Sequence, residues 1–349
     1  MFESDGALVA SAAGLFAGMV LGVAARLGRF CMMGAVEDAA YGHDLGRIRM
    51  VMLAASVAVI GTSLITGLDV FDPTETFYAR NGWSPVGAVL GGLMFGLGMA
   101  FVGTCGFGAL ARVGGGDLRS FLMVIVIGLA AYGTLNGPLA GLRTGLVEIA
   151  PQPGTSLNET AGALIGLAPW MAGIAAGLVL GAAAIGWGGT LLARQKVMVG
   201  ALVGLVIPFA WLATTYAGSV GFDVVPLESV SFSQPLGEAL LYVMLNPLGT
   251  VPGFAVASVF GVVIGAAAGS LWRREFHWEA CDDARELRRQ MLGAVMMGAG
   301  GVLALGCTVG QGLSALSILS PGAPIVVLSI IAGARFGLYL LVEGLPSAR

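Results

Sequence analysis

The chain has 349 residues, of which 57% are hydrophobic and only 11% are charged, and its formal net charge is -3. A soluble domain carries roughly 25% charged residues, so this composition excludes a soluble globular protein and requires an outer surface that faces lipid. The small net charge and the lack of a clustered basic face exclude a nucleic-acid partner.

The first apolar run follows the short segment Met1–Gly6, which carries two acidic residues and no basic one. A cleaved secretory signal begins with a positively charged region and has a shorter apolar core. We therefore expect this run to stay in the protein as its first membrane span.

Apolar runs long enough to cross about 30 Å of hydrocarbon follow one another along the chain. They predict an all-α polytopic membrane protein with about nine transmembrane helices, in one integral membrane domain over residues 1–349. The seventh run contains Asn246-Pro247 and Pro252-Gly253, so we expect its helix to break there. The runs cover residues 7–30, 50–68, 85–103, 120–140, 162–190, 197–217, 239–270, 291–305 and 322–345.

The basic residues predict the orientation of these spans. With the 31–49 loop in the cytoplasm, fourteen of the seventeen basic residues fall on the cytoplasmic side, Arg80 and Arg143 fall outside, and Arg335 lies within the last span. Cytoplasmic loops of membrane proteins carry an excess of Lys and Arg. We expect a multi-pass protein of the cell inner membrane, with a periplasmic N-terminus and a cytoplasmic C-terminus.

Two segments resemble each other at an offset of 202 residues. Gly91–Gly108 reads GGLMFGLGMAFVGTCGFG and Gly293–Gly310 reads GAVMMGAGGVLALGCTVG, with four glycines and a cysteine, Cys105 or Cys307, at matching places. The spans before the two cysteines run in opposite directions. The pattern predicts an inverted pseudo-two-fold repeat with re-entrant cysteine loops, its halves at about 7–140 and 197–345 linked by the span at 162–190.

Three cysteine segments stand out in the sequence. They are GRFCMMGA around Cys31, GTCGFGALARVGGG around Cys105 and GCTVGQG around Cys307. Their glycines permit positive φ angles and can turn backbone N–H groups toward an anion, while a thiol is a soft contact for a sulfur atom. We expect these segments to line a path for a small sulfur-containing solute. Small buried hydrophobes or a Cys105–Cys307 disulfide are the alternatives.

Polar residues and glycines near the cysteines extend the candidate path. Arg29 and Arg112 would attract an anion to the cytoplasmic mouth, or only snorkel to the interface. Thr308 and Gln311 would donate to solute oxygens, or satisfy loop carbonyls. Arg335 is costly inside a span unless it is paired or wet, and Asn246 is a cap or a path residue. The candidate substrate-path residues are Cys31, Cys105, Cys307, Gly106, Gly108, Thr308, Gly310, Gln311, Gly312, Arg112, Arg29, Arg335 and Asn246.

Cofactor and metal chemistry find little support in the sequence. The two histidines, His43 and His277, lie in charged loops, and the four cysteines form no CxxC pair. We expect no zinc or haem site and no nucleotide site, hence no cofactor. The fourth cysteine, Cys281, lies in a charged loop without neighbouring glycines, and we interpret it as a small buried residue.

At the three cysteine segments, the chain resembles the YeeE/YedE family of sulfur transporters. GRFCM, the glycine–cysteine loop followed by Arg-x-Gly-Gly-Gly, and GCTxGQG all match, and the resemblance covers nearly the whole chain. It implies an hourglass-shaped fold of nine spans, in which thiosulfate passes between the thiols of Cys31, Cys105 and Cys307 by S–H···S hydrogen bonds without covalent chemistry. It also implies, as a partner in some members, a small cytoplasmic sulfur-carrier protein that would meet the loops at 104–119 or 272–290.

The sequence as a whole predicts uptake of thiosulfate, or a closely related small sulfur-containing anion, across the inner membrane by a protein that is not an enzyme. One alternative is a membrane thiol redox or sulfur-transfer enzyme, which needs an activated thiolate; no histidine lies near the cysteine loops in the sequence. Transport of another sulfur or selenium species and a non-catalytic membrane scaffold are the others.

Overall fold

The computed structural model describes residues 5–80, 82–147, 152, 157, 168–187, 192–220, 225–246, 250–280 and 283–344. Within these residues the secondary structure is helical apart from two isolated bridges, Trp83 with Gln152 and Asp117 with Glu279. The predicted all-α class is confirmed.

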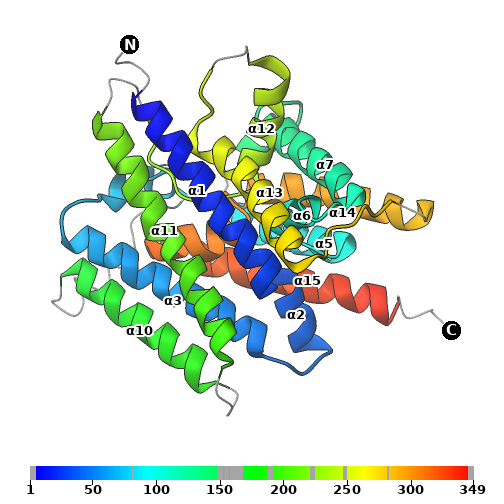
Figure 1. The fold of residues 1–349 in the computed structure, drawn as a ribbon, viewed down its shortest axis with the longest axis horizontal. Coiled ribbons are helices and arrows are strands. Elements are labelled where there is room, and N and C mark those ends of the chain that lie inside the picture. The colour runs from blue at the N-terminus through cyan, green and yellow to red at the C-terminus, as the bar shows by residue number, and fades with distance from the viewer. Residues whose placement is uncertain are drawn as a thin grey trace.

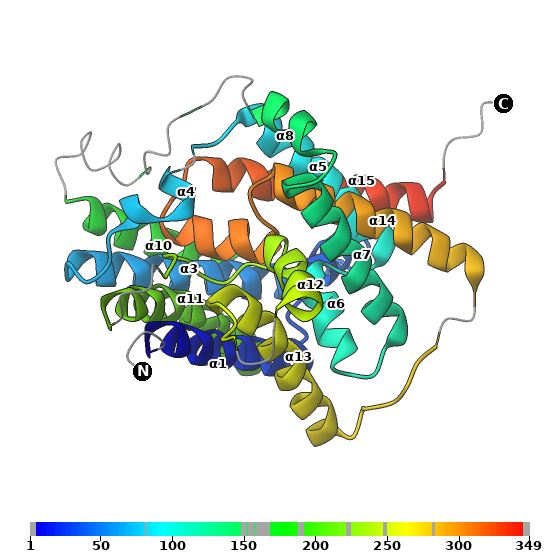
Figure 2. The same cartoon turned by 90° about the horizontal axis from the view of Figure 1, so that it is seen from above.

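The beginning of α1 and the end of α15 lie at opposite ends of the molecule (Figures 1 and 2). The elements are α1 (Asp5–Gly28), α2 (Met32–Ala40), α3 (Gly46–Gly67), η1 (Pro73–Glu75), α4 (Phe77–Arg80), α5 (Pro85–Val102), α6 (Gly106–Val113), α7 (Leu118–Leu135), α8 (Ala140–Val147), α10 (Pro169–Gly186), α11 (Arg194–Val220), α12 (Gln234–Leu245), α13 (Phe254–Arg273), α14 (Ala284–Leu303), the π-helical segment η2 (Gly310–Ala315) and α15 (Gly322–Val342).

Eight helical segments in the described part of the chain are long and apolar enough to cross a membrane, so the protein is a multi-pass membrane protein. The expected span at 291–305 is not among them. It belongs to α14, whose first two turns carry Arg285, Glu286 and Arg288, so that only the second half of this helix is apolar. The eight segments are Asp5–Ala40, Gly46–Gly67, Pro85–Val113, Leu118–Leu135, Pro169–Gly186, Arg194–Val220, Phe254–Arg273 and Gly322–Val342.

Two other predicted spans differ in extent from the observed helices. The expected seventh span, 239–270, is divided as predicted, because α12 ends at Leu245 and α13 begins at Phe254. The expected fifth span, 162–190, corresponds to α10, while residues 162–167 and 188–190 of that prediction lie outside the described residues.

Glycines bring α5 and α14 into backbone contact. A Cβ added at Gly91 would lie 2.8 Å from the carbonyl oxygen of Gly300, and one added at Gly293 would lie 2.7 Å from the carbonyl oxygen of Gly98. Small residues let membrane helices approach this closely, so that packing replaces a hydrophobic driving force that lipid does not supply. Because Gly91 meets Gly300 while Gly98 meets Gly293, the two helices are antiparallel.

Most helices of the first half correspond to a helical segment about 202 residues later in the second half. When every such helix is exchanged for its counterpart, the same pairs of helices are in contact. Helix α1 packs on α13 as α11 packs on α3, and α5 packs on α15 as α14 packs on α7. In the same way, α2 meets α15 as α12 meets α7, and α6 meets α13 as η2 meets α3. The pairs α5–α14 and α1–α11 each match themselves under the exchange. Helix α10 stands apart, since it packs on α3 at one side of the molecule (Figure 1).

Candidate functional site

Each of the three predicted path cysteines stands at the start of a short helical segment. Cys31 is the N-cap of α2, Cys105 is the N-cap of α6, and Cys307 precedes a helical turn that continues into η2. All three are free thiols, so the structure contains no Cys105–Cys307 disulfide. Cys105 and Cys307 are buried, whereas Cys31 is half-buried.

Backbone N–H groups point at the two buried sulfur atoms. The N–H of Gly108 donates to Cys105 Sγ across 3.4 Å, and the N–H of Gly310 donates to Cys307 Sγ across 3.4 Å. Cys307 Sγ also accepts from the N–H of Phe232 at 3.3 Å. A thiol carries one weak donor and a weak acceptor. Cys105 and Cys307 therefore act as acceptors toward the backbone of their own segments.

The cysteines form a connected series with neighbouring hydroxyl groups. Cys31 Sγ lies 3.9 Å from Thr104 Oγ1 and close enough to Cys105 for the two thiols to interact. Cys105 in turn lies beside the Thr308 hydroxyl, which makes no hydrogen bond of good geometry. Since Thr308 follows Cys307 directly, the series links both cysteine loops to Cys31.

The turns that precede the cysteines use the left-handed region of the backbone. Gly103 has a φ of 79° and Gly306 a φ of 155°, as the glycine-rich sequence predicts. Leu305 adopts a φ of 57° without being glycine, a conformation that strains an ordinary side chain. In the second loop, the strained turn therefore falls one residue before its glycine.

The other predicted loop glycines lie within helical segments. A side chain at Gly108 would collide with the Thr104 hydroxyl, and a Cβ at Gly310 would lie 2.6 Å from Ser231 Oγ. Gly106 and Gly312 have room for a Cβ, with the nearest atoms at 3.5 Å and 3.8 Å. Gly108 and Gly310 thus make space for the hydroxyl groups of Thr104 and Ser231.

Three aromatic rings lie beside the cysteines. The ring centroids of Phe30 and Phe107 are 6.5 Å apart, and those of Phe107 and Phe232 are 5.2 Å apart. Phe30 directly precedes Cys31, and Phe107 lies two positions after Cys105. Phe232 is the residue whose N–H donates to Cys307 Sγ. We call these three residues the phenylalanine cluster.

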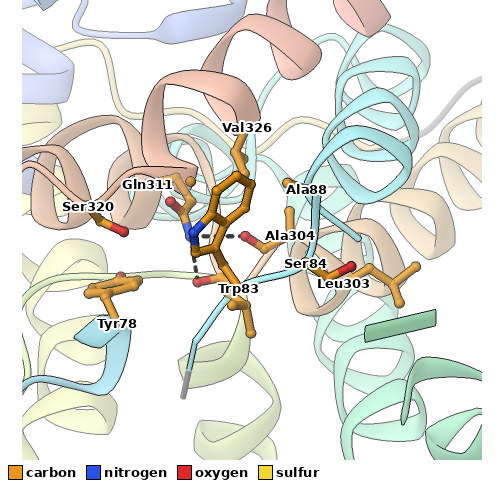
Figure 3. Close-up of a pocket in the computed structure, with 11 residues that line it drawn as sticks. Tyr78, Trp83, Ser84, Ala88, Leu303, Ala304, Gln311, Ser320 and Val326 are labelled. Carbon is orange, nitrogen blue, oxygen red and sulfur yellow. Dashed lines mark hydrogen bonds between the residues drawn. The ribbon is translucent and has the colours of Figure 1, made fainter. Parts of the chain in front are cut away.

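Two small cavities adjoin the thiol series. One, of about 10 Å³, is lined by Cys105, Thr308 and parts of the phenylalanine cluster. The other, of about 20 Å³, is lined by Tyr78, Trp83 and Gln311 among others (Figure 3). A buried water needs about 10–15 Å³ of such space. In this conformation each cavity is therefore no larger than one or two water molecules.

Gln311 and Tyr78 hold the second loop in place. Gln311 Nε2 donates to the carbonyl oxygens of Ala304 at 2.9 Å and Leu305 at 3.1 Å, as the dashed lines in Figure 3 show. Of the two roles predicted for Gln311, the structure shows the one that satisfies loop carbonyls. The Tyr78 hydroxyl donates to the Gly310 carbonyl at 3.1 Å. Burial raises the pKa of Tyr78, so its proton stays in this bond.

The predicted arginines and Asn246 lie on exposed surface. Arg112 donates from Nη2 to the carbonyl of Gly103 at 3.3 Å, and its charge reaches Cys31. Arg29 has a φ of 52° directly before the phenylalanine cluster begins. Arg335 and Asn246 are exposed and are not among the residues that line the two cavities. Cys281 lies outside the described residues.

Several residues at this site were not predicted. Tyr78, Thr104 and Phe232 join the cysteine loops through contacts across long sequence separations, which a motif does not reveal. Ser233 escaped notice because no cysteine marks its segment. The offset of 202 residues would have pointed to Phe232 and Ser233, because they stand where the first half has Phe30 and Cys31.

A larger cleft lies elsewhere on the molecule. It has a volume of about 920 Å³ and is lined by three acidic residues, Asp69, Asp72 and Glu75, together with residues of α11. Three carboxylates repel an anion. The small cavities beside the thiols are therefore the better candidates for an anion path.

The eight apolar helical segments in the described residues place the chain among multi-pass membrane proteins. The family model described as "Sulphur transport" matches residues 27–336, and the chain belongs to this family. A thiosulfate transporter TsuA of Spirochaeta thermophila is 23% identical over 336 residues, which cover 92% of this chain and 96% of that protein. A thiosulfate transporter TsuA of Escherichia coli K12 is 24% identical over 318 residues, which cover 86% of each chain.

Proposed function

We propose that this protein imports thiosulfate across the inner membrane along a path formed by Cys31, Cys105 and Cys307. The observation that carries the proposal is the continuous series of contacts from Cys31 through Cys105 and Thr308 to the Cys307 loop. The alignment with two thiosulfate transporters over most of their length supports the choice of solute.

The ends of the short helices supply the stabilisation that an anion needs inside a membrane. The N-terminus of a helix carries partial positive charge and unpaired N–H groups, and transporters direct the ends of broken helices at charged substrates. Helices α2 and α6 begin directly after Cys31 and Cys105, and a helical turn begins after Cys307. An anion at these thiols meets several helix N-termini within one site.

The thiols match the terminal sulfur of thiosulfate better than its oxygens. A thiol is a soft, polarizable group with one weak donor and a weak acceptor. The solute moves from one thiol to the next by exchanging weak hydrogen bonds. No bond to sulfur is made or broken, so the protein acts as a transporter and not as an enzyme.

The two halves, about 7–140 and 197–345, form one transport domain as an inverted repeat linked by α10. The antiparallel α5–α14 pair and the exchange of helix pairings support this arrangement. With the N-terminus in the periplasm and the C-terminus in the cytoplasm, Arg29 and Arg112 lie at the cytoplasmic mouth. A small sulfur-carrier protein would meet the loops at 104–119 or 272–290 on that side.

Passage requires the loops to move. Cavities of about 10 Å³ and 20 Å³ do not hold a thiosulfate ion. The Gln311 and Tyr78 hydrogen bonds to the Cys307 loop, and the Arg112 bond to Gly103, are the contacts that opening would break or rearrange.

The test is uptake of radiolabelled thiosulfate into cells that lack other sulfate and thiosulfate importers. The wild type should accumulate thiosulfate and grow on it as the sulfur source. Cys105→Ala and Cys307→Ala should each reduce uptake to near background while the protein stays in the membrane at wild-type levels. Wild-type uptake by both single variants would refute the roles of these thiols.

A further inference from the structure

We propose that Ser233 is a fourth contact for the solute, and that it occupies in the second half of the protein the place that Cys31 occupies in the first. The proposal rests on the proposed function, because it names a ligand group of the same path. The predicted role of the three cysteines leaves the second half with one thiol where the first half has two.

The offset of 202 residues relates more than the two cysteine loops. It pairs Cys105 with Cys307, Phe30 with Phe232, and Cys31 with Ser233. It also places α12 where α2 would fall, since α2 begins at Met32 and α12 at Gln234. The structure thus repeats a phenylalanine followed by a thiol or hydroxyl residue, directly before a short helix.

Cys31 and Ser233 have the same local position. Each is the N-cap residue of its short helix, and neither side chain caps that helix with a hydrogen bond. Serine is a preferred N-cap because its hydroxyl usually accepts from the first turn. At Ser233 that usual role is left unfilled, so the side chain is directed elsewhere.

The Ser233 hydroxyl is buried without a partner. The residue is 2% exposed, and its Oγ makes no hydrogen bond in the described structure. Leaving a buried hydroxyl unsatisfied is unfavourable, and such a group in a native protein calls for an explanation. Its backbone neighbour Phe232 donates to Cys307 Sγ at 3.3 Å. Ser233 therefore directly follows the residue whose N–H contacts the thiol of the second loop.

A glycine of α14 makes space for this hydroxyl. Gly301 of α14 lies against Ser233, and a Cβ at Gly301 would collide with Ser233 Oγ. Along the chain, Ser233 is followed by Gln234 and Pro235, the first residues of α12. The site combines a soft donor at Cys307, a hard donor at Ser233 and the beginning of a helix.

This combination fits an anion that has both a terminal sulfur atom and oxygen atoms. The Cys307 thiol contacts the sulfur, and the Ser233 hydroxyl donates to an oxygen. In the other half, Cys31 and Cys105 present two soft donors. Ser233 thus helps to orient the solute as it reaches Cys307, before or after it passes the paired thiols.

The kinetic test compares Ser233→Ala, Ser233→Cys and the control Ser63→Ala. Ser63 is also buried, at 2% exposure, and its hydroxyl also lacks a partner, but it lies on α3 outside the cysteine loops. Loss of one hydrogen bond to a charged solute should raise the KM for thiosulfate about tenfold in Ser233→Ala. Ser233→Cys, whose thiol is a weaker donor, should restore only part of that loss, and Ser63→Ala should match the wild type.

A Ser233→Ala variant with wild-type KM, in a protein whose Cys307→Ala variant is inactive, would overturn the proposal and leave the proposed function standing.

Cross-linking tests, without a transport assay, whether residue 233 lies beside Cys307. In a Cys31→Ala, Cys105→Ala, Cys281→Ala background, Ser233→Cys should form an oxidant-induced disulfide with Cys307, seen as lost maleimide labelling. The same background with Ser63→Cys should keep its labelling. Failure of the Ser233→Cys pair to cross-link would overturn the proposal even if the wild type imports no thiosulfate.

Discussion

The two cysteine loops share a backbone plan and differ in the side chains that complete it. In each loop a sulfur atom accepts from the N–H three residues ahead, Gly108 for Cys105 and Gly310 for Cys307. The first loop turns at Gly103, whereas the second turns at Leu305. The second loop alone is held by Gln311, whose counterpart at the offset of 202 is Ala109.

This difference shows how a repeated backbone can carry unequal chemistry. A glycine adopts a positive φ at little steric cost, so the turn of the Cys105 loop is unstrained, and Arg112 bonds to the carbonyl of Gly103. Leu305 in the same conformation is strained, and Gln311 bonds to its carbonyl. The first loop thus has an unstrained turn, and its Cys105 thiol lies beside a second thiol, that of Cys31. The second is strained and clamped, with one thiol beside a hydroxyl.

The largest effect is expected where the two halves meet, at the α5–α14 contact. Gly98→Leu should prevent folding, because its side chain would push against the backbone of Gly293, and overpacking costs about 1–3 kcal/mol or more. Fluorescence-detected size exclusion of a tagged protein should show aggregated or absent material. The control is Gly133→Leu, since a Cβ there meets nothing within 4 Å. Wild-type elution of Gly98→Leu would contradict the observed packing.

Serine substitutions would separate the two loops by their thiols. Cys307→Ser leaves the second loop without a soft donor, whereas Cys105→Ser leaves the Cys31 thiol nearby. We expect uptake to fall about 100-fold in Cys307→Ser and about tenfold in Cys105→Ser. These losses correspond to one hydrogen bond to a charged solute, which contributes about 1.5–3 kcal/mol. Cys281→Ser serves as the control in the same uptake assay. Equal losses in the two loops would remove the proposed asymmetry.

Gln311→Ala tests whether the clamp stabilises the second loop. It removes hydrogen bonds to the buried carbonyls of Ala304 and Leu305, and should lower the free energy of unfolding by about 1–3 kcal/mol. Thermal unfolding of the detergent-solubilised protein measures the change. Gln311→Asn, which is one methylene shorter, should recover little of the loss. A variant as stable as the wild type would show that the clamp is dispensable.

The turn residues should respond in opposite directions and with the smallest effects. Leu305→Gly relieves the positive φ and should stabilise the protein by up to about 1 kcal/mol, while Gly103→Ala should destabilise it by about 1–2 kcal/mol. A Cβ at Gly103 meets no atom within 4 Å, so that loss would report backbone strain alone. The same thermal unfolding assay applies. A destabilised Leu305→Gly variant would mean that the leucine side chain outweighs the strain.

Much of the fold could be predicted from the sequence because the physics of a lipid surface is simple. Apolar length located the spans, and the proline and glycine residues near Asn246 located the break before α13. The expected span at 291–305 corresponds to the apolar part of α14, which packs on α5. The sequence did not show that the same helix begins earlier, at Ala284, with charged residues such as Arg285, Glu286 and Arg288 in its first turns.

The candidate site was predicted in part. The spacing of glycine and cysteine marked the loops in which backbone N–H groups contact sulfur. The sequence could not decide between the two roles of Gln311, since both use the same amide group. It also gave no reason to place Tyr78 against Gly310, a contact across 232 positions that depends on how α4 folds over the second loop.

The phenylalanine cluster has a consequence for the energy supply of the cell. The rings of Phe30, Phe107 and Phe232 stand together beside the thiols, and two of them line a cavity of only about 10 Å³. A continuous file of water across the membrane would conduct protons and discharge the membrane potential. The phenylalanine cluster leaves too little space for such a file of water, while a thiol can still pass a solute by direct contact. The cell would thereby take up sulfur without short-circuiting the gradient that drives its other transporters.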